Sequence, residues 1–418
     1  MIEKTNISLY ELLFSLSHVI DMVDTNLNSH HEQVAYISFR LAQELSLEEH
    51  QKKDLILSAA LHDIGAFSMK RRLETLTFET NNGFEHAEAG AYLVSTFDSF
   101  ANLVPIIRYH HLEWNYGRGN KFKGEAVPLA SHLLHLADRV AILINKRENI
   151  LSQRNSIVKI IKDYSENMLH PNLVKVFEKL SYKDDFWFSV INTDIIRKDL
   201  KKIFKNWGLE LNLADLLDLS KFYSRIIDFR SNFTATHSKG VAVTAREIAN
   251  LLGWSQTKAI KLEIAGYLHD LGKLAVPAEI LEKPGKLTAD EMNIIKSHTF
   301  YTYHALDSIE GLGEIKEWAA FHHERLDGTG YPFKHDEKRL SVGSRVLSVA
   351  DIFTALTEDR PYRAGMDKDK TLLILDSMAK ENAIDGNIVA KVMENYDLID
   401  NIRELGQNNI KKDYNLLR

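Results

Sequence analysis

The sequence contains no cysteine, and glycine and proline are scarce, with 20 and 7 among 418 residues. Without cysteine the chain has no disulfides, no cysteine-ligated zinc or iron–sulfur cluster, and no cysteine nucleophile. The low glycine and proline content excludes collagen-like and proline-rich chains, and it argues against an all-β sandwich, whose tight turns use both residues. Any metal or catalytic chemistry must therefore depend on carboxylates, lysine, hydroxyl groups and the 18 histidines.

A strong net charge and long apolar segments are also missing. The net charge is −6, from 52 basic and 58 acidic residues, whereas proteins that bind nucleic-acid polymers usually present a basic surface. There is no run of about 18 uncharged apolar residues, so no membrane span is predicted. Residues 1–24 lack the basic segment and cleavage site of a signal peptide. We therefore expect a cytoplasmic protein that binds neither a nucleic-acid polymer nor a membrane.

Apolar residues recur at the spacing of helices, while strand-like alternation is scarce. Val241, Ala245 and Ile248 form one such stripe, and Gly253 follows where a helix cap belongs. Residues 46–49 and 288–291 both have the pattern of a capping box at the start of a helix. These features predict an all-α fold.

A set of histidines and aspartates occurs twice, in the same order and at nearly the same spacing. Each set has a histidine, a His-Asp pair, a second histidine, a His-His pair and an aspartate. The first set is His31, His62, Asp63, His86, His110, His111 and Asp138, and the second is His237, His269, Asp270, His298, His322, His323 and Asp351. This repeat predicts two copies of one helical domain, in residues 1–205 and 206–418.

Each set offers five imidazoles and two carboxylates, which are good ligands for divalent iron, manganese or zinc. One cation cannot readily bind so many groups, but two can, with positions left for water and substrate. Two cations about 3.5–4 Å apart form a clamp for phosphoester cleavage. A single buried histidine is more often a hydrogen-bonded core residue than a ligand. The complete ordered set, present twice, favours metal binding in both copies.

The residues around the second set resemble a known family. The segment 267–273 (YLHDLGK) looks like the signature of the HD phosphohydrolase superfamily, and 322–332 (HHERLDGTGYP) resembles the extended motif of its HD-GYP subfamily. Residues 344–351 and 360–363 are similar to the downstream pattern of that subfamily. The first half resembles the same superfamily with a degenerate signature. The resemblance implies an all-α protein with two tandem HD-type helical domains, the second an HD-GYP domain.

This resemblance also implies a function. Members of the subfamily are metal-dependent phosphodiesterases of bacterial second-messenger signalling, and they hydrolyse cyclic di-GMP or cyclic GMP-AMP. We expect a bridging hydroxide to attack the substrate at a dinuclear centre in the C-terminal domain, which holds two divalent ions, iron or manganese. Two alternatives are a sensor of cyclic dinucleotides with vestigial hydrolysis and another HD nucleotide phosphohydrolase. The sequence does not distinguish a homo-oligomer from a protein with a separate signalling partner.

The resemblance assigns roles to individual residues. It implies that the second set binds the metals and that Asp270 bridges them. Asp270 and Lys273 are the implied catalytic residues, with Lys273 facing the scissile phosphate or the hydroxide. The implied substrate-binding residues are Arg325, Tyr331, Arg345 and Arg363. A guanidinium suits a phosphate, and the tyrosine ring either stacks on a base or only packs the loop.

The chain also departs from the family pattern. Some members carry a glutamate ligand for a third metal where this chain has Phe233, so we predict two metals in the second copy. The first copy has Ala66 in place of Lys273, and its loop at 110–119 lacks the Gly-Tyr-Pro ending. We expect the first copy to bind metal, with or without an organic ligand, and to turn over slowly or not at all.

Overall fold

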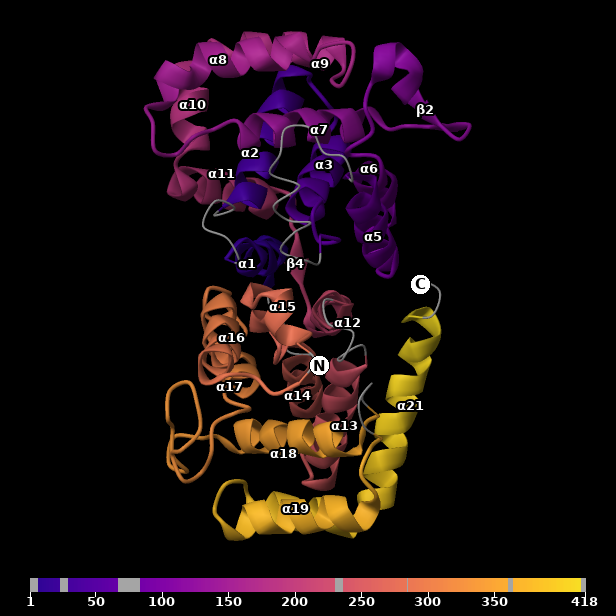
Figure 1. The fold of residues 1–418 in the computed structure, drawn as a ribbon, viewed down its shortest axis with the longest axis vertical. Coiled ribbons are helices and arrows are strands. Elements are labelled where there is room, and N and C mark those ends of the chain that lie inside the picture. The colour runs from indigo at the N-terminus through magenta and orange to yellow at the C-terminus, as the bar shows by residue number, and fades with distance from the viewer. Residues whose placement is uncertain are drawn as a thin grey trace. The chain divides into compact units, whose positions relative to one another are not determined.

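The protein is described by a computed structural model that covers residues 7–22, 29–66, 83–229, 236–283, 285–359 and 364–414. Within these ranges almost all regular structure is helical, which confirms the predicted all-α fold (Figure 1). The strands are two-residue segments that form two small antiparallel pairs. No helix of the described residues is long and apolar enough to cross a membrane.

The chain forms two units. One runs from Leu9 to Leu209, and the other begins at Glu210 and also takes in the residues before Leu9. The division lies between Leu209 and Glu210. The first residues join the second unit because β1 (Ile7–Ser8) pairs with β4 (Glu210–Leu211), with Ile7 opposite Leu211. A strand of two residues has no periodicity that the sequence could reveal.

The N-terminal unit is a bundle of helices around α2, α3 and α7, which pack against one another. Its elements are α1 (Leu9–Asp21), α2 (His30–Glu44), α3 (Glu49–Leu61), α5 (Gly83–Ser95), η2 (Asp98–Leu103), α6 (Val104–Arg108), η3 (Asn115–Asn120), β2 (Lys121–Phe122), β3 (Glu125–Ala126), α7 (Leu129–Ile142), α8 (Ile150–Asp163), α9 (Pro171–Ser181), α10 (Asp184–Val190) and α11 (Thr193–Asn206).

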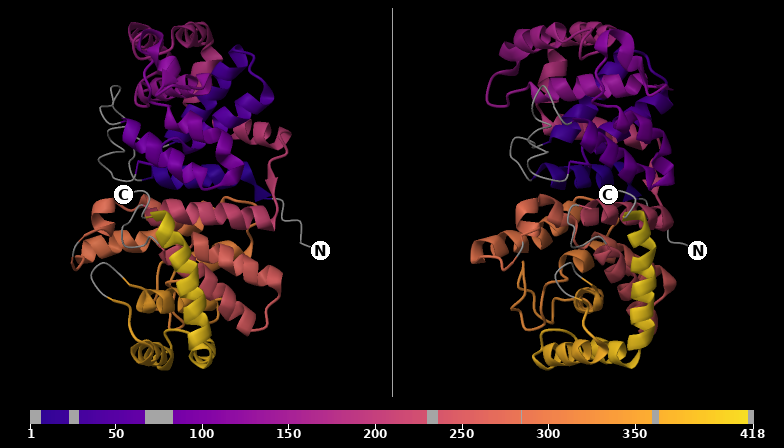
Figure 2. Two further views of the ribbon diagram at one scale, coloured as in Figure 1. Left: turned by 90° about the vertical axis from the view of Figure 1, so that its right-hand side faces the viewer. Right: turned by 45° about the vertical axis from the view of Figure 1, so that its right-hand side comes forward.

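The C-terminal unit is built around α13, which packs against α14, α18 and α21. Its elements after β4 are α12 (Leu213–Phe229), α13 (His237–Leu251), α14 (Gln256–Leu268), η4 (Leu271–Ala275), α15 (Ala278–Leu281), α16 (Ala289–Asp307), α17 (Glu314–Ala320), α18 (Val342–Thr357), α19 (Lys368–Lys380), α20 (Gly386–Glu394) and α21 (Tyr396–Tyr414). Figure 2 shows the helices of both units from two further sides.

Local signals in the sequence set several helix ends. Thr288 and Glu291 form the predicted capping box of α16, and Gly253 has a positive φ of 74° just after α13. The capping box predicted at residues 46–49 is wrong. Glu48 is the cap of α3, and it exchanges hydrogen bonds with Gln51. Ser46 has a φ of 52° in the turn after α2, so it belongs to the end of that helix.

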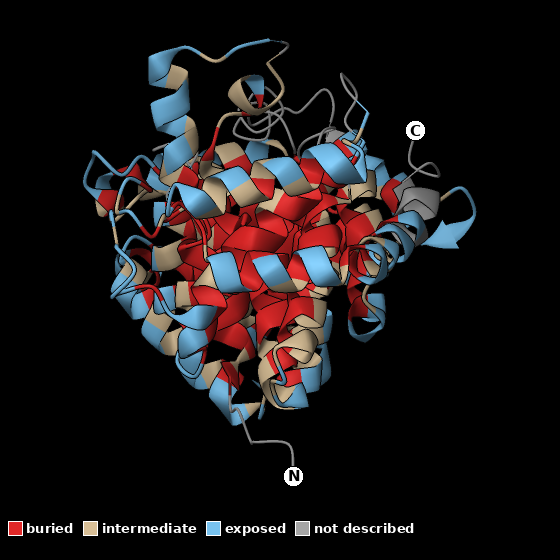
Figure 3. Cartoon of the chain, turned by 90° about the horizontal axis from the view of Figure 1, so that it is seen from below, coloured by how far each residue is buried: buried red, intermediate tan, exposed pale blue. Residues whose placement is uncertain are grey.

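The core consists of the apolar stripes of these helices. Val241, Ala245 and Ile248 of α13 are fully buried, as their spacing predicts, and the corresponding stripe of α2 includes Val34 and Leu41. In Figure 3 buried positions gather on the inward sides of the helices, while exposed positions lie on the outer sides. Each core carries polar side chains in its middle, where His237 and Asp351 of one unit, and His30 and Asp138 of the other, are buried.

Candidate metal centre

The structure brings the seven predicted ligands of the second copy into one largely buried cluster. They come from five parts of the unit. His237 is the first residue of α13, His269 and Asp270 follow α14, His298 lies within α16, His322 and His323 follow α17, and Asp351 lies within α18.

The two aspartates of this cluster each face two histidines. Oδ2 of Asp270 lies 3.2 Å from Nε2 of His269, and its Oδ1 lies 3.5 Å from Nε2 of His298. Oδ1 of Asp351 lies 3.0 Å from Nε2 of His237, and its Oδ2 lies 3.9 Å from Nδ1 of His323. The cluster contains three overlapping groups of residues, and within each group the ligand atoms lie within 4.8 Å of one another. This arrangement suits two cations with a carboxylate between them.

The electrostatics of the cluster lower the pKa of His298, His322 and His323 and of both carboxylates, whereas the neighbouring Glu358 and Asp351 outweigh burial and raise the pKa of His237 to about 10. Burial lowers the pKa of His298 to about 3 and lowers the pKa of His322 well below its usual range. Burial would raise the pKa of Asp270, but His269 and Lys273 outweigh it and hold that pKa well below the ordinary value. A neutral imidazole and a charged carboxylate are the forms that bind a metal.

Lys273 lies beside the bridging position. It is part of η4, and its Nζ is 2.6 Å from Oδ2 of Asp270. Burial would lower the pKa of Lys273, yet the neighbouring Asp270 raises it above the ordinary lysine value. The ammonium group of Lys273 is therefore charged, and it lies next to the Asp270 carboxylate, which faces both His269 and His298.

A glycine lets the His-Asp turn approach α16. A Cβ on Gly272 would lie 1.9 Å from the carbonyl oxygen of His298, so no larger residue fits without moving the helix. The hydroxyl of Thr302 completes the contact. It accepts a hydrogen bond from the amide of Gly272 and donates one to the carbonyl of His269. The signature glycine thus fixes the distance between His269 and His298.

The loop after the His-His pair folds back against the cluster. The buried carboxylate of Glu324 accepts hydrogen bonds from the amides of Phe333 and His335, and a Cβ on Gly330 would lie 2.5 Å from the amide of Arg325. These contacts place Tyr331 with its ring centroid 4.9 Å from that of His323.

Two of the residues predicted to bind substrate lie on this loop. Burial raises the pKa of Tyr331, so its hydroxyl stays protonated. Lys296 of α16 lies over the same ring, 5.6 Å from its centroid. Nε of Arg325 is buried and has no hydrogen-bond partner among the described residues, while its NH2 group is 3.5 Å from Asp327. An unpaired guanidinium donor beside the loop is consistent with anion binding.

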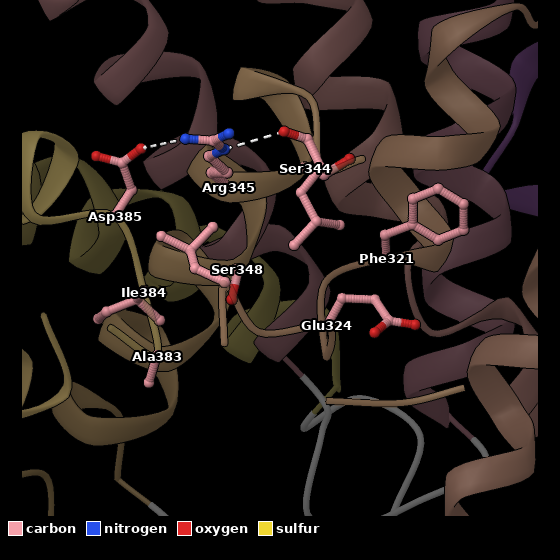
Figure 4. Close-up of a pocket in the computed structure, with 10 residues that line it drawn as sticks. Phe321, Glu324, Ser344, Arg345, Ser348, Ala383, Ile384 and Asp385 are labelled. Atoms are coloured by element: carbon pink, nitrogen blue, oxygen red, sulfur yellow. Dashed lines mark hydrogen bonds and ion pairs between the residues drawn. The ribbon is translucent and has the colours of Figure 1, made fainter. Parts of the chain in front are cut away.

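The structure gives Arg345 a different role from the predicted one. Its guanidinium lies 3.1 Å from Asp385 and donates a hydrogen bond to the carbonyl of Leu340 (Figure 4). It also donates a hydrogen bond to the carbonyl of Glu337. These partners occupy its donors and tie α18 to the preceding loop and to α20. The prediction of substrate contact rested on motif position alone, which does not show where the side chain points.

Two other residues named from the sequence lie outside the described residues. These are Arg363, predicted to bind substrate, and Phe233, which stands where a third-metal ligand occurs in some relatives.

The N-terminal unit contains a corresponding cluster. Ligand atoms of Asp63, His86, His110 and His111 lie within 4.8 Å of one another, and so do those of His30, His62 and Asp63. Asp63 belongs to both groups. In the other unit Asp270 belongs to the group with His269 and His322, and its Oδ1 also faces His298 at 3.5 Å. Oδ1 of Asp138 faces His30 at 3.1 Å, and its Oδ2 is 2.5 Å from the guanidinium of the fully buried Arg139.

The structure corrects one residue of the first set, because His30 and not His31 occupies the place that matches His237. His30 is the first residue of α2 and contacts Asp138, just as His237 begins α13 and contacts Asp351. His31 is turned away along the helix, and its Nδ1 lies 2.6 Å from Oδ1 of Asp21. Its ligand atoms belong to neither of the two groups found among the described residues of this unit.

Buried atoms without partners test whether a metal fits these clusters. Among the described residues, Nε2 of His62, His86 and His110, both ring nitrogens of His111, and Oδ1 of Asp63 are buried without a hydrogen bond. Oδ1 of Asp270 is in the same condition in the C-terminal unit. Unpaired buried polar atoms are costly, and in the N-terminal unit several of them lie within one cluster of ligand residues. Divalent cations would satisfy them, so the residues present fit metal ions.

Two further features of these sites were missed by the sequence reasoning. Nδ1 of His237 faces the carboxylate of Glu358, a residue that no motif in the sequence singled out. Asp228 accepts a hydrogen bond from Ser238, as Asp21 pairs with His31 in the other unit. When His30 is matched to His237, Asp21 aligns with Asp228 and His31 aligns with Ser238. This alignment of the two halves would have revealed the Asp228–Ser238 pair from the sequence.

Comparison with known proteins finds an HD domain in each unit. One HD domain family matches residues 28–143, and a second HD domain family matches residues 221–388. The chain is 28% identical over 401 residues to a 3′3′-cGAMP-specific phosphodiesterase of Vibrio cholerae. The aligned region covers 93% of this chain and 92% of the relative. It is 36% identical over 156 residues to a cyclic di-GMP phosphodiesterase response regulator of Xanthomonas campestris, covering 36% of this chain and 41% of the relative.

A solved structure agrees with these matches. A crystal structure of a cyclic GMP-AMP-specific phosphodiesterase of Vibrio cholerae superposes with a TM-score of 0.63 at 27% identity, covering 94% of this chain and 98% of that one. The match includes both units, and the seven-residue cluster and the loop through Tyr331 and Pro332 lie in the second of them. The chain therefore belongs to the HD domain proteins, as a tandem member whose C-terminal unit is of the HD-GYP type.

Proposed function

We propose that the C-terminal unit is a metal-dependent phosphodiesterase that hydrolyses a cyclic dinucleotide. The observation that carries this proposal is the position of Asp270, whose two oxygens face different histidines of one buried cluster while Lys273 lies beside it. Such a carboxylate can be shared by two cations. The cluster also lies next to a loop that offers an aromatic ring and a guanidinium, which are groups suited to bases and phosphates.

The residues of the cluster define which metals are expected. His237, His269 and Asp351 form one group of ligand atoms, and His298, His322 and His323 form another. Nitrogen and oxygen ligands without sulfur suit iron or manganese, so we propose two such ions with Asp270 between them. When bound, the ions would lower the pKa of a water molecule and neutralise charge on the phosphoryl oxygens.

The protein's own groups would position the substrate. Lys273 carries a positive charge next to Asp270 and can neutralise a phosphoryl oxygen there. The free Nε donor of Arg325 can bind the second phosphate of a cyclic dinucleotide. Tyr331 is held against His323 and can present its ring to a base. Arg363, which lies outside the described residues, is proposed to bind the same phosphate as Arg325.

The proposed substrate is cyclic GMP-AMP rather than cyclic di-GMP. The relative specific for 3′3′-cGAMP matches both units, whereas the cyclic di-GMP relative matches about a third of this chain. The structural neighbour that covers 94% of the chain is also described as specific for cyclic GMP-AMP. Because these relatives come from bacteria, we propose a role in bacterial second-messenger signalling.

For the N-terminal unit we propose metal binding with little or no hydrolysis. Its cluster has the same ligand types and more unpaired nitrogens than the C-terminal cluster. Ala66 occupies the place of Lys273, and it is a fully buried residue that cannot contact a phosphate. The metal-ligand residues are therefore present without the lysine ammonium group that would neutralise the charge of the substrate phosphate.

Metal analysis combined with a substrate panel tests the proposed function. The purified full chain, loaded with manganese or iron, is expected to hold about two ions in the C-terminal unit and to hydrolyse 3′3′-cGAMP faster than cyclic di-GMP. Tight binding of a cyclic dinucleotide without turnover would instead favour a sensor. Hydrolysis of mononucleotides but not of cyclic dinucleotides would favour another HD phosphohydrolase.

A further inference from the structure

The ligand histidines of the C-terminal unit are oriented in two different ways. Nδ1 of His269, His298 and His322 donates to the backbone carbonyl three residues earlier, at 2.7, 2.6 and 2.7 Å. His237 is the first residue of α13 and has a different partner. Its Nδ1 instead lies 3.1 and 3.2 Å from the two carboxylate oxygens of Glu358.

Glu358 is itself held by the C-terminal helix. The carboxylate follows α18 directly and is only 5% exposed, so it needs donors in addition to His237. Gln407 of α21 donates from Nε2 to Oε2 of Glu358 at 3.2 Å. The same amide group donates to the carbonyl of Thr236 at 3.2 Å, next to the start of α13.

The orientation of the Gln407 amide is also determined. Its Oε1 accepts a hydrogen bond of 2.5 Å from Arg403, one turn earlier on α21, and Arg403 pairs with Asp400. Since the oxygen is held by Arg403, the NH2 group must face Glu358. A chain of buried hydrogen bonds thus runs from Arg403 through Gln407 and Glu358 to His237.

A glycine on α13 makes room for this chain. A Cβ on Gly240 would lie 2.7 Å from Nε2 of Gln407 and 2.8 Å from the methyl group of Thr354. Alanine at this position would push Gln407 away from Glu358. The close approach of α21 to α13 is therefore built into the sequence of both helices.

We propose that Glu358 is a positioning residue for the metal ligand His237, and that Gln407 fixes Glu358 for this purpose. By accepting the Nδ1 proton, the carboxylate holds the imidazole in the tautomer whose Nε2 faces Asp351 and the metal. A carboxylate acceptor also makes the ring a stronger ligand than a carbonyl does. In this way α21, which contributes no ligand of its own, controls how well the first histidine binds metal.

The N-terminal unit has no carboxylate at the position that corresponds to Glu358. Glu358 follows Asp351 by seven residues. Asn145 follows Asp138 by the same number of residues. Its side chain donates to Glu148 and accepts from the amide of Arg147 in an exposed turn. The inference therefore applies to the C-terminal unit alone, and it rests on the metal centre proposed above.

Direct metal binding tests the proposal without reference to activity. The full chain carries Asp63→Ala throughout, so that the N-terminal cluster is disabled, and manganese affinity is measured by competition with a chromophoric chelator. We expect Glu358→Gln to weaken binding about 10- to 100-fold, the range found for such outer-sphere partners, and Gln407→Leu to weaken it less. Glu358→Asp, which keeps the charge, should recover part of the loss.

A matched control separates positioning from simple loss of stability. Glu263 of α14 is also a buried glutamate of this unit, and it pairs with Arg246 of α13 at 2.6 Å rather than with a ligand histidine. Glu263→Gln should lower the melting temperature and leave manganese affinity unchanged. Excess manganese should restore kcat to Glu358→Gln with little change in KM.

The outcomes distinguish this inference from the proposed function. Equal manganese affinity in the parent, Glu358→Gln and Gln407→Leu would overturn the positioning role and leave the phosphodiesterase in place. No manganese binding by the parent chain would overturn the metal centre itself. If Glu358→Gln fails to fold, Gln407→Leu and Gly240→Ala carry the test, because both disturb the same chain of hydrogen bonds from its far end.

Discussion

His62–Gly65 of the N-terminal unit and His269–Gly272 of the C-terminal unit form the same turn. In each, Nδ1 of the histidine donates to the carbonyl three residues earlier. In each, a Cβ on the glycine would collide with a backbone carbonyl of the next ligand helix, at 2.2 Å from His86 and 1.9 Å from His298. The turn that presents Asp63 in one unit and Asp270 in the other is thus the same.

What surrounds this turn differs. The C-terminal unit has Lys273 beside Asp270, whereas the N-terminal unit has the buried Ala66. Asp351 and Asp138 each face two histidines, but one oxygen of Asp138 is also paired with Arg139. The difference indicates that the residues proposed to bind metal are separate from the lysine proposed to bind phosphate. The first set can persist after the second has been lost.

The sharpest test of this comparison removes the shared aspartate from each unit in turn. We expect Asp270→Ala to lower the rate of cyclic GMP-AMP hydrolysis by about three orders of magnitude or more, because His269 and His298 lose the carboxylate that faces them both. Asp63→Ala should leave the rate nearly unchanged. Steady-state hydrolysis of the full chains measures both, with circular dichroism to confirm that each variant is helical.

An equal loss of activity in these two variants, with both folded, would contradict the assignment of catalysis to the C-terminal unit. Residual activity in Asp270→Ala that disappears in the double variant would show that the N-terminal unit also turns over.

A second prediction concerns the lysine that distinguishes the units. Lys273→Ala copies the residue found at Ala66, and we expect kcat to fall about 100-fold because a charge aimed at the phosphate is lost. The metal content measured by atomic emission should stay the same, since the histidines and aspartates are untouched. Lys283→Ala is the matched control, because Lys283 pairs with Glu291 away from the cluster. Loss of metal in Lys273→Ala would mean that the lysine supports the site structurally.

A third prediction uses metal removal to count the units that bind. Free metal at 100 times its dissociation constant stabilises a folded unit by about 2.7 kcal/mol, which corresponds to a shift of roughly 5–10 °C in a domain of this size. EDTA should therefore lower the melting temperature of the parent chain. Asp63→Ala and Asp270→Ala should each lose part of this response, and the double variant should lose all of it. A full response in Asp63→Ala would argue against metal in the N-terminal unit.

Much of the fold followed from the sequence, because helical periodicity and the repeated set both act over long segments. The stripe containing Val241 and Ile248 is buried as predicted, and the seven residues of the second set lie together. The choice of His31 over His30 failed for a physical reason. Adjacent residues of a helix point about 100° apart, so a register error of one residue exchanges a ligand for a neighbour. Both residues are histidines here, and the residue type gave no warning.

The contacts of charged side chains could not be predicted in the same way. Arg345 belongs to a motif segment but pairs with Asp385, which is distant in sequence. Glu358 faces His237 only because α13 begins there and α21 packs alongside. Such partners are chosen by tertiary packing, which local sequence does not encode. The family resemblance supplied the ligands, and the structure was needed to find the groups that orient them.

The smallest expected effect separates the two interpretations of Tyr331, stacking on a base or packing the loop. Its ring lies against His323 under Lys296, whereas Tyr116, in the corresponding loop of the N-terminal unit, is 71% exposed. Stacking on a base contributes about 1–3 kcal/mol, so Tyr331→Ala should raise KM for cyclic GMP-AMP about tenfold. Tyr331→Phe should leave KM unchanged because the ring remains. Tyr116→Ala should change neither KM nor kcat. A fall in metal affinity in Tyr331→Ala, with KM unaltered at saturating manganese, would show instead that the ring packs His323 into place.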